Sequence, residues 1–186
     1  MTYRNDGANY VDGKEHARDQ LNKLTQTLDV LSALVREENR NKCPLNVLSV
    51  LEDVTITLSL SELRPDFQLN IEVPDNYQVV ANETLLYLLF RNLIENAHHH
   101  GCDNTLTISL EHQSLRFSNQ NNDAFGAPPP TEPDSAEAPL GIGQGLFLAR
   151  RIVEFHHGEL TVSTSHGDSD NDFSVYLSLP GPEKHK

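Results

Sequence analysis

The chain has 186 residues and is acidic, with 27 Asp and Glu residues against 14 Lys and Arg and a formal net charge of -13. This balance argues against nucleic-acid binding, because neutralising phosphates requires basic surface. Hydrophobic residues make up 37%, which is enough for a globular core, and no run approaches the roughly 20 apolar residues of a membrane span. With only two cysteines, the chain is expected in a reducing compartment.

The first 42 residues divide into a tail and a helix. Residues 1–13 are polar and are predicted to be a disordered tail. Residues 14–42 carry apolar side chains every three or four positions, namely Leu21, Leu24, Leu28, Leu31 and Val35. This spacing predicts a long amphipathic helix. It either packs on its own domain or pairs with another chain, and the absence of an obvious second helix favours pairing.

After residue 42, the hydrophobic pattern predicts helices and short strands. Helices are expected at about 46–63, 83–100 and 144–157, the last capped by Gly158. Strands are expected at 69–73, 78–81, 105–110, 115–118, 159–165 and 173–179. The first two strands are expected to pair around the turn Pro74-Asp75-Asn76, and the third and fourth to form a hairpin. Residues 119–139 predict a long loop. Together these elements predict an α+β fold with helices on one mixed, mostly antiparallel sheet.

Polar side chains gather on one face of the leucine-rich helix 83–100. Asn92, Asn96, His99 and His100 lie at i, i+4, i+7 and i+8, so they share one stripe. Asparagine is a poor helix former, and two of them one turn apart need a reason. Their amide oxygens are hard ligands suited to Mg²⁺. A solvated polar face is the alternative, and the stripe alone does not decide between the two.

A glycine string opens the helix predicted at 144–157. Gly141, Gly143 and Gly145 let the backbone approach an anion, and the first amides of a helix favour phosphate. The string is not a P-loop, because no Gly-Lys-Ser/Thr follows it. A flexible hinge is the alternative interpretation of these glycines.

Taken together, these two segments resemble known motifs. Residues 92–101 resemble the asparagine box of sensor histidine kinases, and residues 141–160 resemble the second glycine box of that family. The resemblance covers residues 44–182 as a catalytic ATP-binding domain. It implies a Bergerat-type (GHKL) two-layer α/β sandwich, with three helices on a mixed sheet and residues 120–140 as the ATP lid. Residues 14–42 resemble part of the family's dimerisation and phosphotransfer hairpin.

The resemblance assigns roles to individual residues. Asn96 would hold the Mg²⁺ of Mg-ATP, with Asn92 assisting. His99 would stand at a phosphate-contacting position and His100 near the nucleoside. The phosphates would lie against Gly141, Gly143, Gly145 and Leu146, and Ser174 would help to bind adenine.

Two features depart from the family pattern. Asn119 stands where the family has an adenine-binding aspartate, with Asp123 as the rival candidate, and the glycines of the first glycine box are missing. A neutral acceptor is weaker than a charged one. A nucleotide-binding-deficient docking or dimerisation module of the same fold is therefore the alternative function. The second departure is the lack of a phosphoacceptor His-Glu motif, which leads us to expect a fragment of a longer receptor.

The implied function is phosphoryl transfer from ATP. Relatives that hydrolyse ATP carry glutamate at position 92, whereas Asn92 is a poor base, so transfer to a histidine outside this chain is expected rather than rapid hydrolysis. A stand-alone ATPase or serine kinase is the least favoured hypothesis. The implied partners are a response regulator and a second copy bound through residues 14–42. The implied location is cytoplasmic, as the inner portion of a membrane-anchored bacterial sensor.

Overall fold

The computed structural model describes residues 41–61, 63, 65–101, 104–120, 143–166 and 171–182, together with Thr25, Leu28, Ser32 and Arg36. Three helices and seven strands lie within these ranges. The helices are α2 (Val47–Ser61), α3 (Glu83–His100) and α4 (Gly143–Phe155). The strands are β1 (Cys43–Asn46), β2 (Gln68–Glu72), β3 (Gln78–Ala81), β4 (Thr105–Glu111), β5 (Ser114–Gln120), β6 (Glu159–His166) and β7 (Asn171–Ser178).

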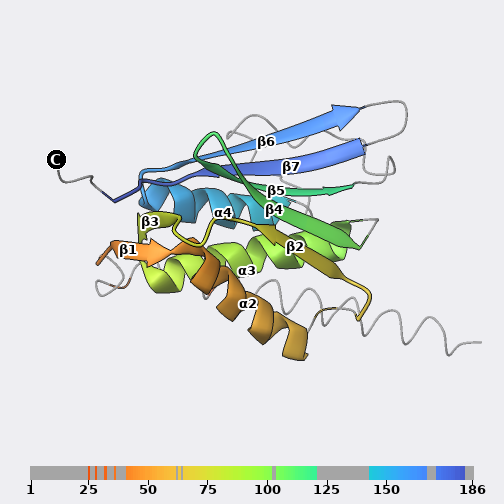
Figure 1. The fold of residues 1–186 in the computed structure, drawn as a ribbon, viewed down its shortest axis with the longest axis horizontal. Helices are drawn as coiled ribbons and strands as arrows, with labels where there is room; N and C mark the ends of the chain where they lie inside the picture. The colour runs from red at the N-terminus through yellow and green to blue at the C-terminus, as the bar shows by residue number, and fades with distance from the viewer. Residues whose placement is uncertain are drawn as a thin grey trace, which may run out of the picture.

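The molecule has two layers, a sheet and a set of helices on one of its faces (Figure 1). The sheet has five strands in the order β2-β4-β5-β7-β6, and only β2 and β4 run parallel. Helix α3 contacts both α2 and α4. The predicted α+β architecture, with three helices on a mixed and mostly antiparallel sheet, is confirmed.

The core lies between the two layers because the strands alternate in side-chain direction. On β4, β5 and β7 the buried apolar residues occupy every second position: Leu106, Ile108, Leu115, Phe117, Val175 and Leu177. The ring of Phe117 packs on that of Phe90 from α3, with centroids 5.9 Å apart. This alternation fixes which side of each strand faces the helices.

The strand pairing around residues 68–81 differs from the prediction. Strand β2 does not pair with β3 but runs parallel to β4, whereas β3 pairs with β1 in a separate two-stranded sheet. Strand β1 itself, which contains Pro44, was not predicted. The turn between β2 and β3 contacts the start of α2, because the Asn46 side chain donates to the carbonyl of Asp75 over 2.6 Å. A local turn signal therefore did not make a hairpin here.

Asparagine side chains begin two of the helices. The Oδ1 atom of Asn46 accepts from the amide of Ser49 at 3.0 Å, and that of Asn82 accepts from the amide of Leu85 at 3.1 Å. Each residue is thus an N-cap that satisfies an otherwise unpaired helical donor. The observed starts of α2 and α3 agree with the predicted ones to within one residue.

The end of α4 differs from the predicted glycine cap. The residue in the left-handed conformation is His157, with φ 61°, and not Gly158. The amides of His157 and Gly158 donate to the carbonyls of Glu154 and Val153, which is the Schellman pattern. Gly158 is needed for a different reason, since a Cβ there would collide with the carbonyl of Ser178.

A buried histidine joins the end of α4 to the start of α3. His156 is 1% exposed, and its Nε2 accepts from the backbone amide of Asn82 at 3.0 Å. Its Nδ1 lies 2.7 Å from the carbonyl of Ile152, so the neutral ring carries its proton on Nδ1. The side chain of Lys42 donates to the carbonyl of Phe155 at 2.7 Å and lies over the Phe155 ring. These contacts fix α4 against α3 at the end remote from the glycine string.

Several predicted segments lie outside the described residues: the tail 1–13, most of the helix 14–42 and the lid after Gln120. Within the predicted helix, Thr25, Leu28 and Ser32 are helical, whereas Arg36, Asn41 and Lys42 are not. The prediction that one helix continues to residue 42 is therefore wrong at its end. Among the described residues, no helix is both long and apolar enough to cross a membrane.

Candidate nucleotide-binding site

The asparagines of α3 face the beginning of α4. Asn92 is 2% exposed, and its Nδ2 donates to the backbone carbonyl of Gly145 over 2.6 Å. Asn96, one turn later, lies against the same glycine, because a Cβ added to Gly145 would collide with the Asn96 amide group. The two asparagines of the predicted polar stripe are therefore directed at Gly145.

The first turn of α4 supplies backbone groups beside this stripe. Helix α4 begins at Gly143, so the amides of its first residues have no intrahelical acceptor and the positive end of its dipole lies here. Such a terminus favours an anion such as phosphate. Leu146 is partly buried against the core, which orients this turn. The predicted phosphate residue Gly141 lies outside the described residues.

The far end of α3 brings Asn119 to the same side of the sheet. A Cβ added to Gly101 would clash with the carbonyl of Ala97 and the side-chain nitrogen of Asn119. Asn119 ends the run of β5 residues that alternate towards the helices, after Leu115 and Phe117. Asn119 thus lies beside the last turn of α3, the helix that carries Asn96.

The histidines of α3 divide between two environments. His98 is buried and packs edge-on against the rings of Phe67 and His99, with centroids 5.2 and 5.0 Å away. His99 is exposed at the helix end, as a predicted phosphate contact requires. The side chain of His100 lies outside the described part of the chain.

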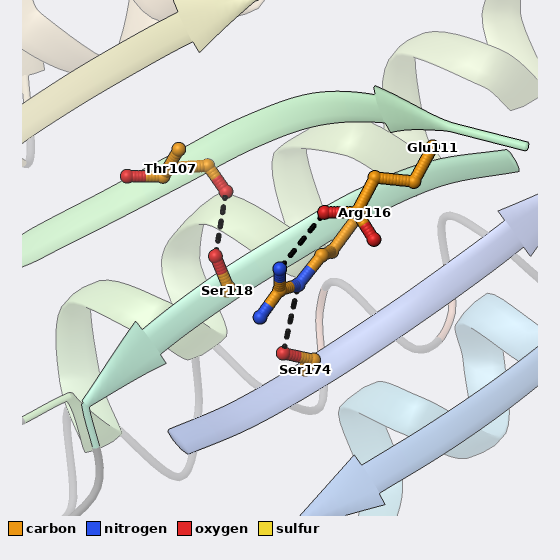
Figure 2. Close-up of polar contacts among 5 residues, drawn as sticks. All are labelled: Thr107, Glu111, Arg116, Ser118 and Ser174. Atoms are coloured by element: carbon orange, nitrogen blue, oxygen red, sulfur yellow. Dashed lines mark hydrogen bonds and ion pairs between the residues drawn. The ribbon is translucent and has the colours of Figure 1, made fainter. Parts of the chain in front are cut away.

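Ser174 is not part of this arrangement. It pairs with Ser118 in the β5–β7 register, and its hydroxyl accepts from Nε of Arg116 at 3.2 Å. Figure 2 shows Ser174 and Arg116 directed towards one another, with Glu111 bound to the same guanidinium at 2.8 Å. By alternation, Ser174 faces away from the helices, since Val175 next to it faces the core. Ser174 therefore lies on the opposite face of the sheet from the asparagines of α3, and its role in adenine binding stays a prediction.

Phe173, which the sequence pattern did not single out, is the β7 residue that lies beside Asn119 on the helix side of the sheet. It is directly opposite Asn119 in the β5–β7 register, and it packs against the core on the helix side of the sheet. Only the register of two strands more than 50 residues apart identifies it, since Phe173 and Ser174 are neighbours in the sequence.

The sequence pattern of a known protein family matches residues 81–181, more than half of the chain. That family is described as the histidine kinase-, DNA gyrase B- and HSP90-like ATPases. The chain belongs to this family. Asn92, Asn96, Asn119 and Gly145 all fall within the matched residues.

Curated relatives of this ATPase-family chain include sensory kinases. It is 24% identical over 176 residues to an adaptive-response sensory kinase, SasA, of Prochlorococcus marinus, covering 87% of this chain and 45% of the relative. It is 25% identical over 138 residues to SasA of Parasynechococcus marenigrum, covering 67% of this chain and 36% of the relative. The chain thus spans less than half the length of these relatives.

Solved structures of histidine kinases share the fold. The cytoplasmic segment of histidine kinase QseC has a TM-score of 0.54 at 17% identity, covering 98% of this chain and 100% of that one. The mycobacterial sensor histidine kinase MprB has a TM-score of 0.57 at 19% identity, covering 76% and 99%. The described part of this chain therefore has the two-layer Bergerat-type fold of these histidine kinase structures.

Proposed function

We propose that this chain is the ATP-binding catalytic domain of a two-component sensor histidine kinase. In this proposal it transfers the γ-phosphoryl group of Mg-ATP to a histidine outside the chain, from which it passes to an aspartate of a response regulator. The observation that carries the proposal is the meeting of Asn92 and Asn96 with Gly145. It brings a hard oxygen ligand and a helix N-terminus to one place.

Magnesium fits the side chain of Asn96. Its amide oxygen is the kind of hard ligand that Mg²⁺ accepts alongside phosphate oxygens and water. The side chain is partly exposed, and the missing Cβ of Gly145 leaves the space that it fills. The ion would supply positive charge to the triphosphate, which matters in a chain of net charge -13 because long-range attraction cannot bring ATP to this site.

Other residues would bind the rest of the nucleotide. In the proposed pose, amides of Gly141, Gly143, Gly145 and Leu146 contact the phosphates, and residues 120–140 close over them. His99 and His100 lie near the phosphates and the nucleoside. The side-chain oxygen of Asn119 accepts from the amino group of adenine, and its position beside the end of α3 supports this role.

Burial of Asn92 supports a kinase over a hydrolase. An amide is a poor base, and this one is 2% exposed with its nitrogen already bound to Gly145. It cannot activate a water molecule. Glu95 is no substitute, because its carboxylate pairs with Arg91 at 2.8 Å. Transfer to an imidazole needs no such base, since the ring is itself a nucleophile.

The proposed partners follow from the sensor-kinase type. They are a response regulator and a second copy of the chain joined through residues 14–42. Leu28, a member of the predicted apolar seam, is 57% exposed, which supports pairing with another chain. We further propose a cytoplasmic location within a membrane-anchored parent protein.

A second function is favoured by one observation. Asn119 is a neutral residue at the proposed adenine position, and a neutral acceptor binds an amino group less tightly than a carboxylate. On that basis the alternative is a docking or dimerising module of the same fold that no longer binds nucleotide.

Calorimetric titration with a non-hydrolysable ATP analogue, with and without Mg²⁺, tests the proposal. We expect saturable heat with Mg²⁺, and its loss in Asn96→Ala. Asn70→Ala is the matched control, because Asn70 is an exposed asparagine of strand β2. No heat at millimolar nucleotide would instead support the docking module.

A second assay addresses the transfer step. The chain is mixed with labelled ATP and a dimerisation hairpin that bears a phosphoacceptor histidine. An acid-labile, base-stable label on the hairpin is the expected product. Release of inorganic phosphate without labelling would refute the kinase assignment.

A further inference from the structure

Asn92 and Asn96 lie one helical turn apart, yet the structure gives them different surroundings. Asn92 is 2% exposed and its amide nitrogen donates to Gly145, a residue 53 positions away in the chain. Asn96 is partly exposed and lies in the space left by the absent side chain of the same glycine. Equal roles for the two asparagines do not fit this difference.

We infer that Asn92 is a positioning residue that holds the first turn of α4 against α3, and that it does not bind the metal ion. This inference rests on the proposed function and deepens it. A metal ligand must present its oxygen to an accessible ion. Asn92 instead contributes a donor, and its environment is the interior of the domain.

This hydrogen bond can position the first turn of α4 because of where its acceptor lies. Gly145 is the third residue of α4 (Gly143–Phe155), so its carbonyl belongs to the turn whose amides are left free for phosphate. Fixing this carbonyl fixes the distance between that turn and the side chain of Asn96. Without the bond, no hydrogen bond from Asn92 keeps Gly145 in close contact with the Asn96 side chain.

Other contacts of α4 among the described residues act elsewhere on the helix. The opposite end is fixed by His156 and Lys42, three turns away. Apolar packing of Leu148 and Ala149 holds the middle, but packing is not directional. The Asn92 bond therefore supplies a directional restraint at the nucleotide end of the helix.

Two substitutions separate a donor from a metal ligand. Asn92→Asp keeps a hard oxygen and adds a charge, but it removes the donor and sets a carboxylate against the Gly145 carbonyl. Asn96→Asp makes the same chemical change at the proposed ligand. Binding of the ATP analogue is measured by calorimetry at several Mg²⁺ concentrations and in EDTA, and circular dichroism checks that each variant folds.

We expect Asn92→Asp to weaken nucleotide binding about tenfold to a hundredfold, since a lost buried hydrogen bond is worth that much. The loss should be similar with Mg²⁺ and in EDTA, and the concentration of Mg²⁺ giving half of the maximal effect should stay the same. Asn96→Asp should shift mainly that Mg²⁺ dependence. If Asn92→Asp retains or tightens Mg²⁺-dependent binding, Asn92 is a ligand and the inference is overturned.

A second variant and a second measurement guard against an unfolded Asp variant or an absent nucleotide. Asn92→Leu keeps the same branched side-chain shape and suits a leucine-rich helix. Hydrogen exchange of the amides of the first turns of α4 should be faster in this variant, whereas exchange around Phe155 should be unchanged. If the wild-type chain binds no nucleotide, the proposed function fails but this exchange experiment still tests Asn92. Unchanged exchange at the start of α4 would refute the positioning role.

Discussion

Replacing His156 by leucine should lower the stability of the domain by an amount that its hydrogen bonds define. The ring accepts from the amide of Asn82, and both groups are buried. Leucine fills a similar volume but accepts nothing, so the Asn82 amide is left without its partner. An unsatisfied buried donor costs about 1–3 kcal/mol. The carbonyl of Ile152 keeps a partner, since the backbone amide of residue 156 also donates to it.

The pH dependence provides a sharper test of the same arrangement. Burial lowers the pKa of His156 from its usual value near 6.5, and the charges of Lys42 and His157 lower it further, against the opposing hydrogen bond to Ile152. As pH falls, the unfolded chain therefore binds this proton before the folded chain does. The stabilisation is fully present above pH 6.5 and is lost as pH falls from 6.5 towards the folded-state pKa.

Urea unfolding of the wild-type chain and of His156→Leu, measured between pH 5 and 8, checks both statements. The difference in the free energy of unfolding should be about 1–3 kcal/mol at pH 8 and should shrink below pH 6.5. Other titrating groups are common to both proteins and cancel in this difference. A difference that is absent at pH 8, or that stays constant down to pH 5, would refute the reasoning.

Three further changes have expected outcomes. His157→Gly should raise the free energy of unfolding by about 1 kcal/mol, because a non-glycine residue is strained in the left-handed backbone conformation; an unchanged denaturation midpoint would contradict this. Gly145→Ala should weaken calorimetric binding of the ATP analogue at least about tenfold, because its Cβ collides with Asn96. Gly181→Ala is the control, since a Cβ there meets nothing closer than 3.9 Å, and equal binding by both variants would disprove the collision. Asn46→Ala should cost about 1 kcal/mol through the lost N-cap, measured by urea unfolding, and a loss below a few tenths would argue against it.

Local spacing predicted the bounds of α2, α3 and α4 to within two residues. The buried face of α3 follows from leucines at helical intervals. The polar stripe of Asn92 and Asn96 was also predictable, because residues four apart on a helix always share a face. These features depend only on neighbours in the sequence.

Strand partners were less predictable. The turn after β2 suggested a hairpin, yet β2 pairs with β4 and β3 pairs with β1. Which strands lie side by side depends on how the helices that separate them in the sequence pack in the folded domain. No short segment encodes that choice. The same limit applies to Ser174, which was predicted to help to bind adenine and whose side chain bonds to Arg116 on the face of the sheet away from the helices.

The amino-acid sequence by itself determined the bounds of α2, α3 and α4 to within two residues, and it determined the two motifs, because each depends on spacing within a few turns of chain. The tertiary structure decided that Asn92 binds the carbonyl of Gly145, that Asn119 faces Phe173 and the end of α3, and that His156 joins two helix ends. Each of these contacts joins residues distant in the chain, and a one-residue change of strand register would turn a side chain to the other face of the sheet.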